Sequence, residues 1–254
     1  MKKRSLHAPV VRLGDAGPTV SRLIFGTEHI IDRSPRAGGA VLAEAHRRYG
    51  INHWDTAPSY DSHPQVASGL RQAGRENVVV TSKISAETEE EAGRELDGIL
   101  EELEIDCLDI ALLHGVPTGH LARRQGALRH LVRARERGIV GCTGISSHSP
   151  PTLAEAVQSP DIDVVCGTLN RAGSHIDDGD LEDMLRALEA CHSAGKGVYV
   201  IKVLGRGDLA DDVRGAIEFV CQYPFIHAYN IGMRDIREVE ENLEWIMRST
   251  GTPV

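Results

Sequence analysis

The stretch NVVVTSKISAETEEEAGRELDGILEELEIDCLDIALLH, residues 77–114, carries the alternation that decides the fold. It opens with the β-branched run Asn77–Lys83 and closes with the apolar run Cys107–His114, each about the length of a buried strand. Between them, Glu87–Leu103 repeats its apolar residues at spacings of three and four, which is the pattern of an amphipathic helix. The stretch therefore predicts a strand, a helix and a second strand.

The same unit recurs along the whole chain. Similar short runs lie at Arg22–Phe25, Ile51–Asp55, Ile139–Ile145, Ile162–Leu169, Gly197–Val203 and Phe225–Ile231. Eight strands, each followed by a helix, predict a (β/α)8 barrel. An open doubly wound sheet is the alternative, but Phe25-Gly26-Thr27-Glu28 after the first strand is not the glycine-rich fingerprint of that fold. We expect a single barrel domain over residues 1–254.

A short hairpin is expected before the first barrel strand. The turn residues Gly14-Asp15-Ala16-Gly17-Pro18 separate Val10–Leu13 from Thr19–Ser21. We expect this β-hairpin to cap the floor of the barrel.

Composition excludes several classes of protein. With 41% hydrophobic residues the 254-residue chain can bury a large core, and a net charge of -9 argues against a nucleic-acid-binding face. No apolar run approaches the roughly 18 residues of a membrane span. The start MKKRSLHAPVVRLG has no apolar signal core, and the five cysteines are far apart, so we expect a cytoplasmic protein. No sequence feature indicates the oligomeric state.

Three strands end in an ionisable residue. Asp55, Lys83 and His114 each close a row of alternate residues that share one face of a strand. A single polar residue at a strand end usually meets water, but three on consecutive strands can converge at the barrel mouth. Only five of the 28 basic residues are lysines, so Lys83 is also unlike the ordinary surface charge of this chain.

Tyr60 follows Asp55 by five residues and suggests a chemistry for this group. A free phenol has a pKa near 10, which a nearby ammonium such as Lys83 would lower, while Asp55 would keep that ammonium charged and oriented. His114 could orient a carbonyl oxygen. Protonation of a carbonyl oxygen requires a partner reaction at the carbon, for which hydride from a nicotinamide is the natural source.

The residues named so far resemble the aldo-keto reductase family. The matching segments are Gly50–Ala57 followed by Tyr60, Val80–Lys83, Leu112–His114, Gly144–His148, Val200–Gly205, and Gly232–Arg234 leading to Glu241–Leu243. The resemblance implies an NADPH-dependent reductase of a small aldehyde or ketone. It also implies that Tyr60 is the general acid, helped by Lys83, Asp55 and His114.

The resemblance also implies a cofactor site. Ser146 and Asn170 match positions at the nicotinamide end, Leu204 and Gly205 open the loop over the pyrophosphate, and Arg234, Glu241 and Asn242 match the segment that grips the adenosine phosphate. The remaining predicted contacts are Gly26, Thr27, Ser147, Lys202, Gly232, Met233 and Glu238. In physical terms, the helix expected to start near Asp235 would direct amide groups at an anion.

The sequence departs from the family pattern at several of these places. Ser147 replaces a common asparagine, and Leu169 replaces a tyrosine that stacks on the nicotinamide in many members. Glu238 would oppose a 2′-phosphate, so NADH is a second candidate donor. Asp61 and His63 are expected to add ionisable groups at the rim. The chain stops twelve residues after Asn242, which predicts no long covering loop and an open, shallow substrate site.

Three other functions remain as alternatives. A metal-dependent hydrolase could use His53, Asp55, His114 and His148, although the first strand lacks the His-x-His pair of many such enzymes and no metal site is predicted. A Schiff-base aldolase could use Lys83 or Lys202, although Asp55 would keep Lys83 protonated. The third is a nicotinamide-nucleotide-binding sensor or regulatory protein of the same fold with little turnover.

Overall fold

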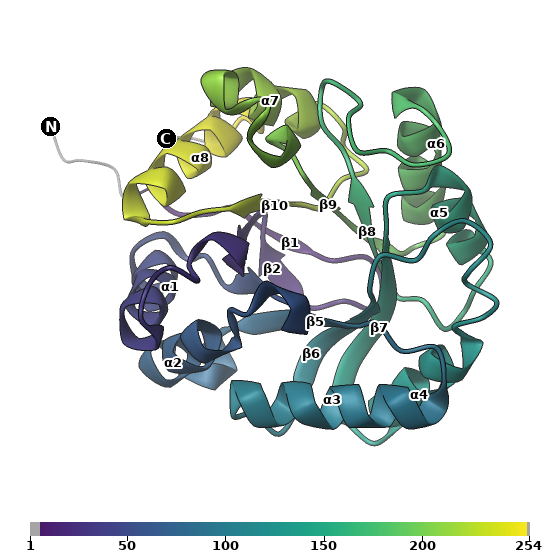
Figure 1. Cartoon of the computed structure of the whole chain (residues 1–254). Coiled ribbons are helices and arrows are strands. Elements are labelled where there is room, and N and C mark those ends of the chain that lie inside the picture. Colours follow the sequence, from purple (N-terminus) through teal and green to yellow (C-terminus); the bar gives the residue numbers. More distant parts are fainter. Residues whose placement is uncertain (1–5, 253–254) are drawn as a thin grey trace, which may run out of the picture.

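The computed structural model describes residues 6–252, so the first five residues of the charged start lie outside the described part. Eight parallel strands close into a barrel in the order β10-β3-β4-β5-β6-β7-β8-β9 (Figure 1). These strands are β3 (Leu23–Gly26), β4 (His53–Asp55), β5 (Val79–Ile84), β6 (Leu108–Leu113), β7 (Val140–Ser147), β8 (Val164–Thr168), β9 (Gly197–Ile201) and β10 (Ala228–Gly232). The predicted (β/α)8 barrel is confirmed.

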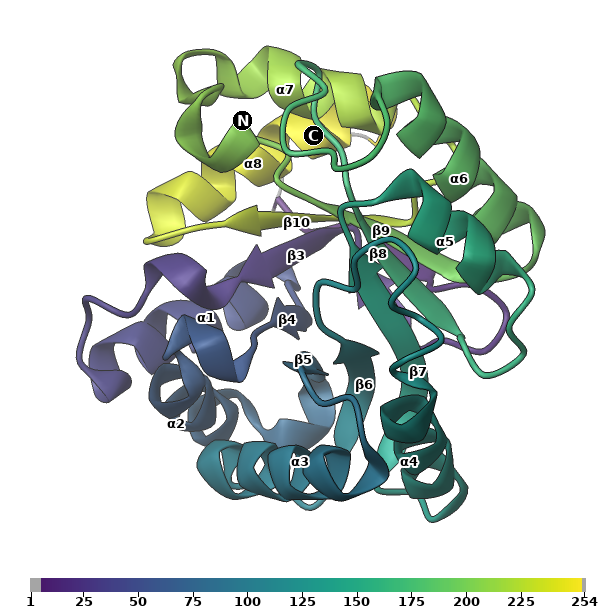
Figure 2. The ribbon, with the colours of Figure 1, turned by 45° about the vertical axis from the view of Figure 1, so that its right-hand side comes forward.

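An outer ring of helices surrounds the barrel (Figure 2). The helices are α1 (Pro35–Tyr49), α2 (His63–Ala73), α3 (Glu89–Leu103), α4 (Gln125–Glu136), α5 (Pro150–Val157), α6 (Leu181–Ser193), α7 (Val213–Cys221) and α8 (Ile236–Ser249). Short 3-10 turns are η1 (Thr27–His29), η2 (Pro58–Tyr60), η3 (Arg75–Asn77), η4 (Gly205–Gly207) and η5 (Ala210–Asp212). None of the helices among residues 6–252 has the length and apolar character needed to cross a bilayer.

Element boundaries differ from the expected ones by a few residues, for identifiable reasons. The helix expected from Glu87 starts at Glu89, because Thr88 caps it and forms a capping box with Glu91. The strand expected from Phe225 starts at Ala228, where backbone pairing with Tyr199 of β9 begins. Local pattern locates an element, whereas pairing and caps set its ends.

The predicted hairpin lies at the floor of the barrel. Strands β1 (Val10–Arg12) and β2 (Thr19–Ser21) pair antiparallel. Leu13 and Val20 are fully buried and belong to the same apolar cluster as the residues that line the barrel interior. The hairpin therefore closes the barrel at the end opposite the carboxyl ends of the strands.

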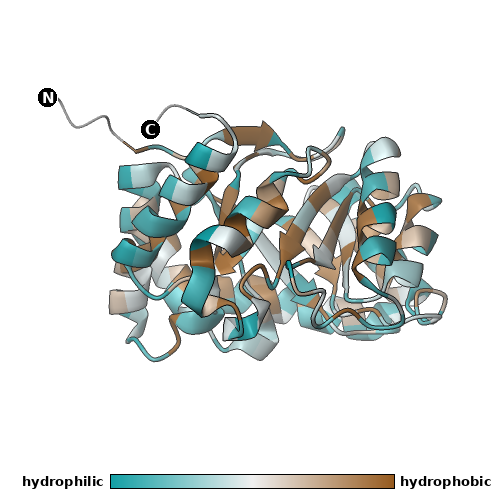
Figure 3. Cartoon of the chain, turned by 90° about the horizontal axis from the view of Figure 1, so that it is seen from above, coloured by the Kyte–Doolittle hydropathy of each residue, from teal (hydrophilic) through white to brown (hydrophobic). Residues whose placement is uncertain are grey.

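The core has two layers. The larger layer fills the space between the strands and the helices, whose outward faces are hydrophilic (Figure 3). A smaller cluster fills the barrel interior and comprises Leu13, Val20, Ile24, Ile110, Leu112, Cys142, Val164, Cys166, Tyr199 and Ala228. Because successive strand residues point to opposite faces, each strand contributes side chains to both layers. Polar side chains lie at the carboxyl ends of the strands, which form the mouth of the barrel.

Candidate active site

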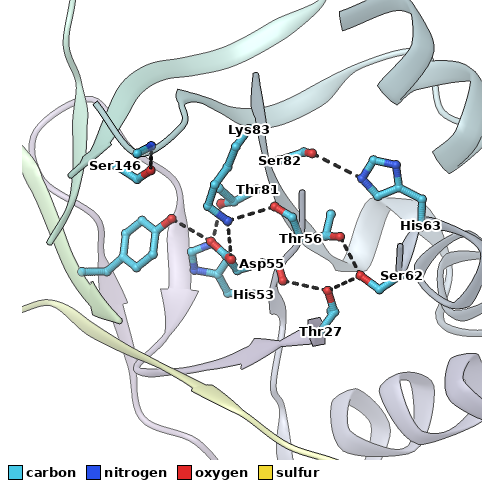
Figure 4. A network of polar contacts seen from close by, with 12 residues as sticks. Thr27, His53, Asp55, Thr56, Ser62, His63, Thr81, Ser82, Lys83 and Ser146 are labelled. Atoms are coloured by element: carbon cyan, nitrogen blue, oxygen red, sulfur yellow. Dashed lines mark hydrogen bonds and ion pairs between the residues drawn. The ribbon is translucent and has the colours of Figure 1, made fainter. Parts of the chain in front are cut away.

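A buried ion pair between Lys83 and Asp55 forms the centre of the site (Figure 4). The two side chains lie at the ends of neighbouring strands β5 and β4, and each is only 1% exposed. Lys83 Nζ donates to Asp55 Oδ1 at 2.5 Å and to the Thr56 carbonyl at 2.9 Å. Burial opposes the charge of the ammonium, but Asp55, with Tyr60 and Cys166, more than offsets it and raises the pKa of Lys83, so the ammonium stays charged.

Tyr60 lies over this ion pair at the end of the turn η2. Lys83 Nζ is 4.8 Å from the centroid of the Tyr60 ring. Since an ammonium has three N–H groups and two are already bonded, one remains for the phenol.

The pKa of Tyr60 differs from the expectation. Burial raises the pKa of its phenol above 10, and the positive charge of Lys83 offsets only part of that rise. Lys83 lowers the pKa as expected, but desolvation of the phenolate is the larger effect, so the net pKa is raised. The phenol is neutral at physiological pH, as a proton donor must be.

His114 directly follows β6 and packs against Tyr60. The two rings meet edge to face, with 5.9 Å between their centroids. Burial, followed by the charge of Lys83, lowers the pKa of His114 to about 4. The imidazole is therefore neutral at physiological pH and can donate a hydrogen bond without adding charge.

A chain of hydroxyl groups fixes the loop that carries Tyr60 (Figure 4). Ser62 Oγ lies 2.8 Å from Thr27 Oγ1 and 3.0 Å from Thr56 Oγ1. Thr27 also donates to the carbonyl of Asp55 at 3.0 Å. Thr27, predicted as a cofactor contact, thus has a fully buried side chain that ties β3 to β4.

A residue that the sequence analysis did not single out also bonds to Asp55. The hydroxyl of Tyr199, in the middle of β9, donates to Asp55 Oδ2 at 2.7 Å. The signal was present in the sequence, because alternation along β9 turns Tyr199 into the barrel, where a phenol needs a hydrogen-bond partner.

His63 lies away from the expected rim. Its side chain is 2% exposed, with Nδ1 2.6 Å from Glu102 Oε2 of α3 and Nε2 3.5 Å from Ser82 Oγ of β5. It therefore faces the layer between strands and helices, because it is the first residue of α2. Asp61, in contrast, is exposed, with left-handed backbone at φ 56°.

The residues predicted at the nicotinamide end are hydrogen-bonded to nearby backbone. Ser146 Oγ accepts from Gly115 N at 2.8 Å, and Ser147 Oγ donates to the Val116 carbonyl at 2.7 Å. Asn170 donates to the Ser174 carbonyl at 2.9 Å and accepts from the Ser174 amide at 3.1 Å. These side chains shape the loops after β6 and β8. Leu169 is fully buried in the core.

Lys202 and Gly205 follow β9 at the mouth. Lys202 is half-buried, and its Nζ lies 2.8 Å from Nδ1 of His148. Among residues 6–252, no carboxylate lies within 4.0 Å of this ammonium. Burial and the charge of Arg206 lower the pKa of Lys202. Gly205 has left-handed backbone at φ 57°, and Leu204 before it is half-buried.

The backbone amides at the start of α8 already donate to carboxylates of the protein. Asp235 Oδ1 accepts from the amides of Arg237 and Glu238 at 3.0 and 3.1 Å. Glu238 Oε1 accepts from Arg234 Nε and Nη2 at 3.0 and 2.8 Å, and its Oε2 accepts from the Arg234 amide at 2.7 Å. The amides expected to face an anion are thus partnered within the protein itself.

The other predicted adenosine-side contacts differ in exposure. Glu241 is exposed, whereas Asn242 is 4% exposed and Met233 is fully buried in the core. Gly26 and Gly232 pair with each other across β3 and β10. A Cβ at Gly26 would lie 2.4 Å from Asn230 Oδ1, so a larger residue there would displace that side chain.

The arrangement gives little support to the hydrolase, and for the aldolase it disfavours Lys83 but not Lys202, whose pKa is lowered. His53 is fully buried, with Nε2 2.8 Å from Thr81 Oγ1, and burial lowers its pKa to about 4. Residues 6–252 hold no group of three or more His, Cys, Asp or Glu side chains placed to bind a metal ion. Lys83 is held protonated by Asp55, which disfavours it as a Schiff-base nucleophile.

Comparison with known sequences gives a consistent result. A sequence model described as the aldo/keto reductase family matches residues 22–219. The 2,5-diketo-D-gluconic acid reductase B of a Corynebacterium species is 28% identical over 151 residues, which cover 58% of this chain and 52% of that protein. The chain spans about half the length of the curated relatives it matches.

Solved structures share the fold over nearly the whole chain. A Pseudomonas aeruginosa protein assigned to the aldo-keto reductases superimposes with a TM-score of 0.82 at 24% identity, over 97% of each chain. The holo form of an aldo-keto reductase from Bacillus halodurans gives a TM-score of 0.78 at 17% identity, over 97% of this chain and 95% of that one.

Proposed function

Because this chain belongs to the aldo/keto reductase family, we propose that it reduces an aldehyde or ketone to the alcohol, taking hydride from a reduced nicotinamide dinucleotide and a proton from Tyr60. The supporting observation is the position of Lys83 between Asp55 and Tyr60. The buried ammonium is held on one side by the carboxylate and has one N–H left for the phenol.

The proposed proton transfer follows from the charges in the site. A bound dinucleotide would supply hydride to the carbonyl carbon, and the carbonyl oxygen would then need a proton. Tyr60 donates its proton to that oxygen. Lys83 stabilises the resulting phenolate. The neutral imidazole of His114 donates a hydrogen bond to the carbonyl oxygen of the substrate.

The mouth of the barrel offers groups that fit a dinucleotide. Lys202 is a half-buried cation with no carboxylate within 4.0 Å among the described residues, although Asp177 and Glu28 act on it from further away, and such a group could meet a diphosphate. The left-handed turn at Gly205 allows backbone to approach such a ligand closely. We propose that these residues, with Ser146 and Asn170, hold the dinucleotide.

The identity of the hydride donor is a separate proposal. The family resemblance implies NADPH, with Arg234 meeting the adenosine phosphate. In the structure the Arg234 guanidinium donates two hydrogen bonds to Glu238, so a phosphate would compete with this carboxylate. We therefore propose NADH as a second donor, to be compared with NADPH.

The decisive experiment combines nucleotide titration with turnover of a carbonyl panel. The panel begins with keto acids of sugars, because one relative is a reductase of 2,5-diketo-D-gluconic acid, and extends to simple aldehydes, ketones and quinones. Tyr60→Phe should lower kcat about 100-fold or more, the contribution of a positioned general acid, while changing nucleotide affinity less than about twofold.

Tyr223→Phe is the matched control, because Tyr223 is a half-buried tyrosine packed against Phe219 and Phe225. It should retain full turnover. Unchanged turnover in Tyr60→Phe would remove the phenol from its proposed role. Tight binding of NADPH or NADH without consumption across the panel would instead support the sensor alternative.

We further propose that the chain forms one domain, that it is located in the cytoplasm, and that it has no nucleic-acid or membrane partner.

A further inference from the structure

Tyr199 links the apolar interior of the barrel to the ion pair of Lys83 and Asp55. It is fully buried in the barrel interior, where its ring meets that of His53 edge to face at 5.8 Å. Its strand β9 pairs with β8 so that Tyr199 is level with Cys166, another interior residue. The hydroxyl of Tyr199 reaches across the barrel to Asp55 Oδ2 at 2.7 Å.

This contact completes the hydrogen bonding of the Asp55 carboxylate. Oδ1 accepts from Lys83 and Oδ2 accepts from Tyr199, so each oxygen is held from a different strand. A carboxylate bonded at both oxygens cannot rotate without breaking a charge-assisted hydrogen bond. The orientation of the Asp55 carboxylate fixes the position of the Lys83 ammonium. The position of that ammonium determines where the third N–H of Lys83 points.

We propose that Tyr199 is a positioning residue for the reduction, which acts on Tyr60 through Asp55 and Lys83 and does not touch the substrate. The inference rests on the proposed function, because it assigns Tyr199 a part in setting up the proton donor.

The direction of the effect on Tyr60 follows from electrostatics. The charged and titratable groups around Tyr60 are Lys83 from β5, Asp55 from β4, His114 after β6 and Cys166 from β8. The Tyr199 hydroxyl points its proton at Asp55 and so offsets part of the negative charge. Without it, Asp55 acts more strongly on Tyr60, the phenolate is less favoured, and the phenol becomes a weaker acid.

The first test is kinetic. Tyr199→Phe keeps the ring and removes only the hydroxyl, so it should lower kcat about tenfold and leave the KM for the dinucleotide within about twofold, as loss of a charge-assisted hydrogen bond predicts. The basic limb of the pH profile of kcat should move to higher pH. In an Asp55→Asn background the same substitution should lower kcat less than about twofold, because no carboxylate remains to be oriented.

Tyr229→Phe provides the matched control. Tyr229 is also a fully buried strand tyrosine, but its hydroxyl accepts from Arg22 Nη2 at 3.1 Å, and its ring packs in the layer outside the barrel. Circular dichroism and nucleotide titration establish that each variant is folded. The proposal is overturned if Tyr199→Phe matches Tyr229→Phe in kcat and pH profile, or if its loss is undiminished in the Asp55→Asn background.

A second readout does not need turnover. Tyrosinate absorbance followed against pH, with Tyr60→Phe identifying the Tyr60 component, should show that component at higher pH in Tyr199→Phe than in the unchanged protein. An unshifted component contradicts the inference. If the unchanged protein reduces no carbonyl with either dinucleotide, the proposed function fails, and the titration alone still decides whether Tyr199 acts on Tyr60.

Discussion

At the scale of single residues, the cost of burying charge explains the arrangement around Lys83. An isolated ammonium at 1% exposure would be strongly destabilising, and removing one partner of a buried ion pair typically costs about 3–5 kcal/mol. Asp55, the Thr56 carbonyl and the Tyr199 hydroxyl together satisfy the pair. The chain therefore maintains a fully partnered charge at the base of the mouth, which fits a role in chemistry.

His53 shows the opposite solution, a titratable residue kept neutral. Its folded pKa is about 4 against 6.5 for an ordinary histidine, because the imidazole is fully buried. The unfolded chain binds the proton first as pH falls. Stability is therefore complete above pH 6.5 and is lost as pH drops toward 4, by up to about 3 kcal/mol for this residue.

We predict that His53→Gln reduces the difference in unfolding free energy between pH 7 and pH 4.5 by about 2–3 kcal/mol, measured by urea denaturation at both values. His29→Gln, at an exposed histidine, should leave that difference as in the unchanged protein. An identical pH dependence in His53→Gln would show that protonation of His53 does not oppose folding.

At the scale of elements, strained backbone gathers in the loops that follow the strands. Five of the six non-glycine residues with left-handed φ in the described chain lie there, with φ between 55° and 62°, and the sixth, Glu104, ends α3; the five are Asp61, His175, Asp178, Lys202 and Arg206. Such conformations cost of order 1 kcal/mol each and persist where the surroundings demand them. Their place beside the predicted mouth agrees with a site that needs particular side-chain directions there.

Helix α8 supports a prediction about the cofactor. In the structure Glu238 holds Arg234 with two hydrogen bonds, so a phosphate must compete with a carboxylate for the guanidinium. Glu238→Ala should improve the Kd for NADPH about threefold, because the exposed guanidinium no longer exchanges a carboxylate for the phosphate, and change the Kd for NADH less than about twofold.

Glu240→Ala makes the same charge change at an exposed position of the same helix and is the control for this titration. Equal gains in NADPH affinity for both variants would indicate a general effect of net charge. Equal gains for NADPH and NADH in Glu238→Ala would show that Arg234 does not meet the additional phosphate.

At the scale of the whole molecule, the barrel separates stability from chemistry. The hairpin residues Leu13 and Val20 form an apolar floor, whereas Asp55, Lys83 and His114 lie at the carboxyl ends of the strands. Substitutions at the floor should therefore change stability with little effect on turnover.

Leu13→Ala tests this separation. Leu13 is fully buried against the barrel interior, so we expect a loss of about 3 kcal/mol in unfolding free energy by urea denaturation. The kcat of the folded protein should be unchanged. Ile31→Ala, at a 44% exposed residue, should change stability by less than about 0.5 kcal/mol. A fall in kcat in folded Leu13→Ala would show that floor and mouth are coupled.

The sequence by itself determined the barrel, its floor hairpin and the convergence of Asp55, Lys83 and His114. These follow from periods of two and 3.6 residues, which are properties of a local segment and need no knowledge of its neighbours. The expected open, shallow substrate site and the roles of the cofactor residues stay predictions.

Only the tertiary structure decided the contact of Tyr199 with Asp55 and the orientation of His63 toward Glu102. The raised pKa of Tyr60 belongs with these, because desolvation depends on every group that surrounds the phenol. The contact of Tyr199 with Asp55 joins residues 144 positions apart, a separation at which no local pattern specifies a partner.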